Sequence, residues 1–164
     1  MSVAALLREF EMESATTRRA LERVPSDKLD WKPHQKSMSL GHLAMHLASG
    51  PGMIAAWALT DAFVFTREPA AVAESTADVL AAHDAGTANV KMVLNTIGDS
   101  GLGTMWSASA GGKTLMTMPK GVLMRSVVLN HSYHHRGQLT VYLRLLDVPV
   151  PSIYGPSADE NPFG

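Results

Sequence analysis

The chain is predicted to be all-α, an up-and-down four-helix bundle with a short β-hairpin before the last helix. Four long segments carry apolar residues in steps of three and four, the spacing of one helical face. No strand pattern alternates with these segments, which argues against a βαβ fold. A length of 164 residues suits one domain with its own core, so residues 1–164 are expected to form a single domain.

The four helices are expected over residues 2–23, 37–57, 72–97 and 119–146. Pro25 ends the first helix, and either Ser37 or Ser39 can cap the second. The run Ser49-Gly50-Pro51-Gly52 predicts a kink or break in the second helix. Arg67-Glu68-Pro69 marks a loop, after which the third helix begins.

A β-hairpin is expected between residues 104–110 and 113–118, because the Gly111-Gly112 pair suits a two-residue turn. Straight pairing across this turn would place on one face Met105, Ser107, Met116 and Met118. The other face would then hold Trp106, Ala108, Leu115 and Thr117. The Pro/Gly-rich tail, residues 148–164, is predicted to be extended.

The composition removes several function classes. The chain has no cysteine, which excludes disulfides, iron–sulfur clusters, thiolate zinc sites and a cysteine nucleophile. A net charge of −1 without a run of five basic residues argues against a general DNA binder. No nucleic-acid partner is therefore expected, although a local basic groove would fit. No segment reaches about 18 uninterrupted apolar residues, so no membrane span is predicted. The N-terminus lacks the basic region of a signal peptide, and a cytoplasmic location is expected.

The segment Asn130-His131-Ser132-Tyr133-His134-His135-Arg136-Gly137-Gln138 holds three of the seven histidines. His131 and His135 are four residues apart, about 40° around a helix, so both imidazoles can reach one point. Both fall on the predicted inward stripe of the last helix, whereas His134 flanks it. Two nitrogen ligands on one helical face are half of a metal site.

A third ligand is sought on the other helices. His46 is preferred because it lies deep in the apolar run of the second helix, with His42 one turn earlier as the alternative. His83 on the third helix is the reserve ligand. Three neutral imidazoles leave a position open on a divalent ion, as in catalytic zinc sites, whereas a closed structural site uses four protein ligands. Nitrogen ligation suits Zn²⁺ or Ni²⁺, with Co²⁺ and Fe²⁺ as further options.

Four other side chains are candidates for roles around such a site. Glu13 could orient a ligand histidine, and Gln138 could contact a substrate. Arg136 is off the stripe and is expected at the surface or against the tail, while Tyr142 could line a pocket or pack in the core. An adaptable apolar pocket or irregular core filling would use Met38, Met45, Met53, Met105, Met116, Met118 and Met124.

Three motifs carry a family resemblance, namely Leu29-Asp30-Trp31-Lys32-Pro33-His34, Ser39-Leu40-Gly41-His42-Leu43-Ala44-Met45-His46 and His131-Ser132-Tyr133-His134-His135-Arg136-Gly137-Gln138-Leu139. In this order, with the closing Tyr154-Gly155-Pro156-Ser157-Ala158-Asp159-Glu160, the chain resembles the DinB family of the DinB/YfiT-like superfamily. This family is distinct from the DNA polymerase that shares its name. The resemblance implies a bundle, usually a homodimer, that holds a divalent metal through one histidine of the second helix and two of the last. Matched by motif, these ligands are His46, His131 and His135.

The resemblance also implies a range of activities. Some relatives are thiol-dependent transferases or isomerases that use low-molecular-weight thiols such as bacillithiol or mycothiol. The leading hypothesis is therefore a metal-dependent thiol S-transferase with a small-molecule electrophile as substrate. The second is a metal-dependent hydrolase with Glu13 as general base. The third is a non-catalytic, stress-induced metal or small-ligand binding protein, whose site is closed by His83 or His42.

Overall fold

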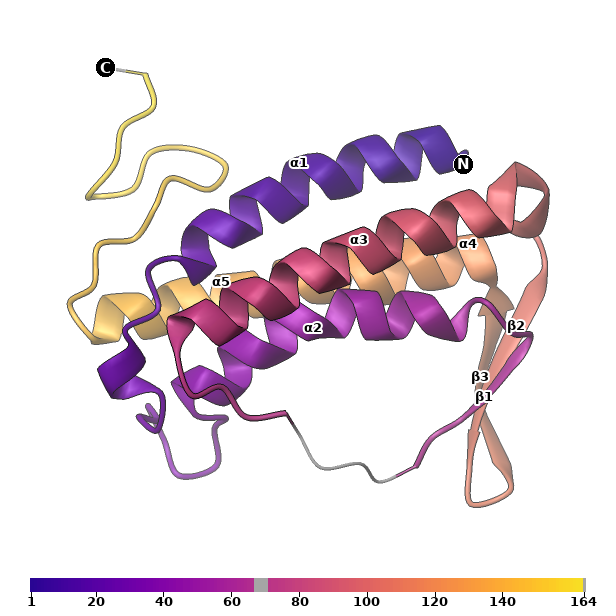
Figure 1. The fold of residues 1–164 in the computed structure, drawn as a ribbon, viewed down its shortest axis with the longest axis horizontal. Helices are drawn as coiled ribbons and strands as arrows, with labels where there is room; N and C mark the ends of the chain where they lie inside the picture. The colour runs from indigo at the N-terminus through magenta and orange to yellow at the C-terminus, as the bar shows by residue number, and fades with distance from the viewer. Residues whose placement is uncertain (67–70, 164) are drawn as a thin grey trace.

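The computed structural model describes residues 1–66 and 71–163, which form four long helical stretches and a small sheet at one end of them (Figure 1). The helices are α1 (Val3–Leu21), α2 (Leu40–Trp57), α3 (Thr76–Gly101), α4 (Lys120–Val122) and α5 (Asn130–Leu145), with a 3-10 turn η1 (Ser26–Lys28) and a π-helical segment η2 (Leu123–Leu129). The strands are β1 (Ala62–Val64), β2 (Met105–Ala110) and β3 (Lys113–Pro119). The loop predicted at Arg67-Glu68-Pro69 lies outside the described residues. No helix among those described is long and apolar enough to cross a bilayer.

Serine side chains begin three of the helices. The hydroxyls of Ser2, Ser39 and Ser75 accept hydrogen bonds from backbone N–H groups in the first turns of α1, α2 and α3. Ser39, not Ser37, is thus the cap of α2, and α3 starts four residues later than predicted. The helix α2 continues without a break through Pro51.

The helices α2 and α3 run in the same direction, so the predicted up-and-down alternation is wrong between them (Figure 1). Early residues of both helices share one core cluster, and late residues of both share the other. The connection from Ala58 to Ser75 returns the chain to the opposite end of the bundle, which a short loop could not do. Sequence periodicity reports the buried face of each helix but not its direction.

A glycine pair brings α2 and α3 close together. A Cβ atom built on Gly52 would lie 2.6 Å from the Cα atom of Gly86, a distance that real side chains do not tolerate. The Asn89 Nδ2 group donates a hydrogen bond of 2.7 Å to the Gly52 carbonyl oxygen, which ties the two helices at this crossing. The α2–α3 pair therefore forms a closely packed layer that carries one wall of the site described below.

The sheet has three strands in mixed orientation, and only two of them were predicted. Strand β1 pairs with β2 in parallel, and β2 pairs with β3 across the expected Gly111-Gly112 turn, where both glycines have positive φ. A shift of register between Ala108 and Ser109 places Trp106 opposite Met118 and Ala108 opposite Met116. The predicted assignment of hairpin side chains to the two faces is therefore wrong, because the irregularity shifts the pairing of residues 116–119 by one position.

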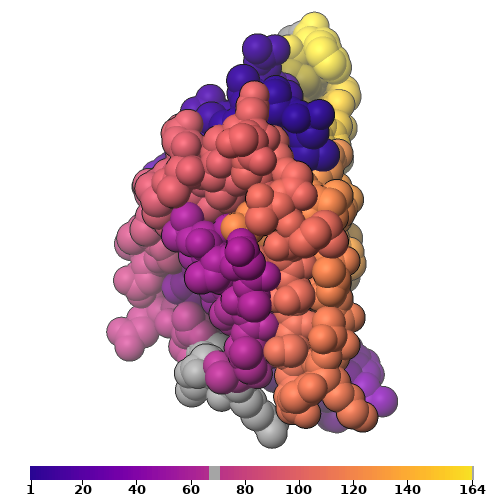
Figure 2. Space-filling model, turned by 90° about the vertical axis from the view of Figure 1, so that its right-hand side faces the viewer, coloured from indigo at the N-terminus to yellow at the C-terminus, as the bar shows by residue number. Residues whose placement is uncertain are grey.

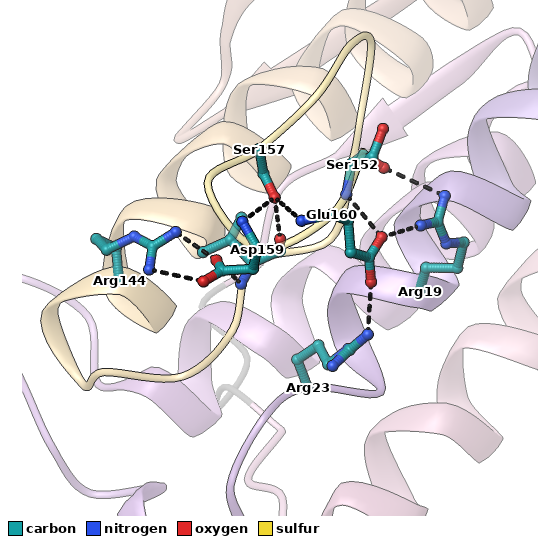
Figure 3. A network of polar contacts seen from close by, with 8 residues as sticks. Arg19, Arg23, Arg144, Ser152, Ser157, Asp159 and Glu160 are labelled. Atoms are coloured by element: carbon teal, nitrogen blue, oxygen red, sulfur yellow. Dashed lines mark hydrogen bonds and ion pairs between the residues drawn. The ribbon is translucent and has the colours of Figure 1, made fainter. Parts of the chain in front are cut away.

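The C-terminal tail is held by ion pairs against two helices (Figure 3). Glu160 accepts hydrogen bonds from Arg19 on α1 and from Arg23 just beyond the end of this helix. Asp159 pairs with Arg144 on α5 and also accepts a bond from the Val150 N–H group. The segment predicted to be simply extended is thus fastened across one end of the bundle by several charged contacts.

Candidate metal centre

Three histidine side chains converge between α2 and α5. His46 comes from α2, and His131 and His135 come from consecutive turns of α5. The Nε2 atom of His131 lies 2.9 Å from Nε2 of His46 and 3.0 Å from Nε2 of His135. One nitrogen from each ring lies within 4.8 Å of the other two, close enough for all three to reach one ion.

The surroundings keep these imidazoles neutral. The pKa of His46 is lowered to about 4, first by burial and then by the neighbouring His135, His131 and His42. Burial is also the main cause that lowers the pKa of His131 and of His135. A neutral imidazole offers a nitrogen lone pair, so at neutral pH all three rings are in the form that binds a metal.

A glutamine amide orients one of the rings. The His135 Nδ1–H group donates a hydrogen bond of 2.7 Å to the Gln138 Oε1 atom, three residues later on α5. With Nδ1 carrying the proton, the lone pair of His135 lies on Nε2, the atom nearest His131. The residue considered above as a substrate contact is therefore one that positions a candidate ligand.

The other histidines lie outside this group. His83 is buried between α3 and α1, where its Nε2 atom lies 3.2 Å from the Ser14 hydroxyl. The exposed His134 has its ring edge-on to His135, with centroids 4.8 Å apart. His42 lines a neighbouring pocket but is not part of the three-nitrogen group. Among the described residues, neither His83 nor His42 completes the site as a fourth ligand.

Two expectations for charged residues are corrected. Arg136 is only 2% exposed, so it does not lie at the surface; its Nη2 atom lies 2.6 Å from the Glu13 carboxylate and also contacts the Tyr154 hydroxyl. The same Glu13 oxygen accepts a hydrogen bond from Tyr154, while Arg136 also donates to the Thr17 hydroxyl. Glu13 therefore joins α1, α5 and the tail. The expected contact of Arg136 with the tail is present as its bond to the Tyr154 hydroxyl. Glu13 forms no hydrogen bond to the candidate ligands.

A pocket of about 390 Å³ opens beside His46. It is lined by His42, Met45, His46, Ser49, Met53, Trp57, Phe63, Phe65, Thr66 and Ala71. Only two of the seven methionines proposed for a cleft are in this lining. Met124 belongs to the core, and Tyr142 packs edge-on against Trp31, as expected for a core residue.

The pocket also uses residues that the sequence did not single out. Phe63 and Phe65 come from β1 and the residues that follow it, and β1 was not predicted. The four consecutive apolar residues 62–65 are too short a run to separate a strand from a loop. The aromatic wall of the pocket is therefore a product of the tertiary structure.

Comparisons with known proteins agree with this architecture. A family model described as the DinB family matches residues 1–161. The uncharacterized protein YrdA of Bacillus subtilis (strain 168) is 28% identical over 160 residues, which are 94% of this chain and 89% of that protein.

Two crystal structures have a similar fold. A DinB-like protein from Bacillus cereus ATCC 10987 superposes with a TM-score of 0.74 at 20% identity, covering 93% of this chain and 98% of that one. The DinB-like protein YjoA from Bacillus subtilis gives a TM-score of 0.70 at 18% identity, covering 91% and 97%. At these identities the likeness concerns the fold alone.

Proposed function

Since the chain belongs to the DinB family, we propose that it is a metal-dependent S-transferase that joins a low-molecular-weight thiol to a small electrophile. The observation that carries the proposal is the convergence of three neutral imidazole nitrogens beside an apolar pocket. The nitrogens supply a metal site, and the pocket supplies room for an organic substrate next to it.

The three residues fit a divalent metal. The Nε2 separations of 2.9 and 3.0 Å are within a few tenths of an ångström of the roughly 3.3 Å between neighbouring nitrogens on a tetrahedral zinc ion. No fourth protein ligand lies in the part of the chain that the structure describes. His46, His131 and His135 would hold Zn²⁺ or Ni²⁺, and also Co²⁺ or Fe²⁺, with a position left for a ligand from solution.

The proposed reaction uses a thiol from solution because the chain has no cysteine of its own. A bound divalent metal supplies a positive charge that lowers the pKa of a thiol, so that the thiolate is present at neutral pH. The sulfur forms a bond to the electrophilic carbon, the leaving group departs with its electron pair, and the thiol proton passes to solvent. The protein's part is to hold the three imidazoles neutral and to bind the electrophile against Met45, Met53 and Trp57.

The two alternatives have less support. Hydrolysis would need a general base, and the candidate Glu13 already accepts hydrogen bonds from Arg136 and Tyr154. A closed, non-catalytic site would need His83 or His42 as a further ligand, and both lie outside the group of three among the described residues.

The test is turnover by the purified, zinc-loaded or nickel-loaded chain with a panel of low-molecular-weight thiols and electrophiles. We expect metal-dependent product formation that His131→Ala abolishes. His134→Ala is the matched control, because it removes an exposed histidine from the same turn that is outside the group of three. If the metal-loaded protein shows no turnover and binds none of the thiols, the proposal is contradicted.

A further inference from the structure

The pocket beside His46 has two chemically different ends. His42, His46, Ser49, Met53 and Trp57 follow one another in steps of four, three, four and four, so they form one face of α2. The first three are polar and the last two are apolar. From His46 to Trp57 the helix advances by roughly 16 Å at 1.5 Å per residue, which gives the pocket a long axis along α2.

The apolar end is a wall of packed aromatic rings. Trp57 stacks on Phe63 with ring centroids 4.5 Å apart, and Phe65 meets Trp57 edge-on at 5.2 Å. Trp106 lies parallel to Trp57 on the strand β2, at 6.3 Å. Figure 2 shows this end of the molecule, where the magenta end of α2 and β1 lies beside the orange hairpin. Because the rings support one another, the wall is preformed and needs no rearrangement to receive a ligand.

Two methionines complete the apolar lining. Met45 is buried, whereas Met53 is 52% exposed although it belongs to the pocket. Thioether sulfurs make favourable contacts with aromatic rings, and the flexible side chain adapts to the shape of its partner. Together with Phe63 and Phe65, these side chains favour a flat aromatic group over a polar one.

The polar end offers one imidazole for a ligand. Within residues 1–66 and 71–163, the His42 side chain forms no hydrogen bond, whereas its backbone N–H group donates to the Ser39 hydroxyl. The Ser49 hydroxyl is already used, since it donates to the Met45 carbonyl oxygen. His42 is therefore the pocket side chain best able to bond a polar group of a ligand beside His46.

We propose that this pocket binds amphipathic substrates with an aromatic tail. The ring packs against Phe63, Phe65 and the two methionines, and the polar, reactive end lies beside His42 and His46. His42 determines specificity by a hydrogen bond to this polar end. The inference rests on the proposed function and names its substrate class, an aryl electrophile with a polar group next to the reacting carbon.

The test measures binding to the zinc-loaded full chain by calorimetry, without thiol. The probes are 2-naphthalenemethanol, benzyl alcohol and 1-octanol. We expect the naphthyl probe to bind about tenfold more tightly than benzyl alcohol, because it buries a second ring, and more tightly than the octyl probe. Met53→Asp should weaken naphthyl binding about tenfold or more by placing a charge in the apolar lining.

Two controls separate specific effects from loss of structure. Met92→Asp changes a methionine of similar exposure, 47%, on α3 outside the pocket, and should leave binding unchanged. His42→Leu should weaken binding of 2-naphthalenemethanol but not of 2-methylnaphthalene, which has no hydroxyl group. A merely structural role of His42 would affect both probes alike.

The outcomes distinguish this inference from the proposed function. Equal binding of naphthyl and octyl probes, absence of binding by every probe, or no effect of Met53→Asp would overturn the inference. Tight naphthyl binding without turnover for any thiol would instead overturn the transferase proposal and leave the pocket assignment standing. Turnover restricted to substrates without an aromatic ring would overturn the pocket assignment and leave the transferase proposal standing.

Discussion

Replacing Gln138 by leucine is expected to weaken metal binding without unfolding the protein. The side-chain amide accepts the 2.7 Å hydrogen bond from His135 Nδ1–H, and Gln138 is only half-buried. Leucine removes the acceptor at similar volume. The His135 ring then loses the contact that fixes its rotation and its tautomer, so Nε2 is less well aimed at the shared point.

The magnitude follows from this single contact. Loss of a group that orients a metal-bound histidine typically costs 10- to 100-fold in affinity, which is about 1.4–2.7 kcal/mol. Water can reach part of the half-buried Gln138 position and replace the acceptor, so we expect about 10- to 30-fold. Gln138→Glu should have the opposite effect at pH 7.5, since a carboxylate forms a stronger, charge-assisted bond and raises the basicity of the ring.

The assay is competition for Zn²⁺ against a chromophoric chelator at pH 7.5. The chain contains one other glutamine, Gln35, which is exposed, and Gln35→Leu is the matched control that should leave the dissociation constant unchanged. Thermal unfolding of the metal-free variants checks that the fold is intact. A Gln138→Leu dissociation constant within twofold of the unmodified protein would refute the role assigned to this residue.

Two further predictions concern stability. The folded-state pKa of His46, about 4, is below its ordinary 6.5, so the unfolded chain takes up this proton first; the free energy of unfolding should fall as the pH drops from about 6.5 toward 4. Urea titrations of the metal-free protein at pH 7 and pH 5 test this, and equal midpoints would contradict it. Arg136→Met should lower the free energy of unfolding by about 3–5 kcal/mol, since it leaves the Glu13 carboxylate, 16% exposed, without its cation. Chemical denaturation measures the loss, and Glu13→Gln added to Arg136→Met should restore part of it.

Much of the candidate site could be predicted from spacing, because spacing fixes geometry within one helix. The four-residue step places His131 and His135 on one face whatever the surroundings, and the apolar run around His46 points that ring inward. The packing of one helix against another was harder to predict. His83 also lies on an inward stripe, yet it is buried beside Ser14 in another part of the core. The apolar stripe of one helix does not reveal which other elements pack against it. For the same reason, the sequence predicted neither strand β1 nor the direction of α3.

The buried face of the last helix differs from the predicted stripe by one residue, and this difference gives the site its access. A π-helical turn holds more residues than an α-helical turn, so η2 rotates the helix that follows it. The deepest positions of α5 are consequently Arg136, Leu139 and Leu143, with His135 beside them. His131, expected on the inward stripe, lies instead at the border of the buried face, as Gln138 does, and both are half-buried. Burial there is enough to lower the pKa of His131, yet the border position keeps this imidazole within reach of a ligand from solution. The same rotation turns Arg136 inward, where it holds Glu13 and the tail, so site access and tail attachment have one structural cause.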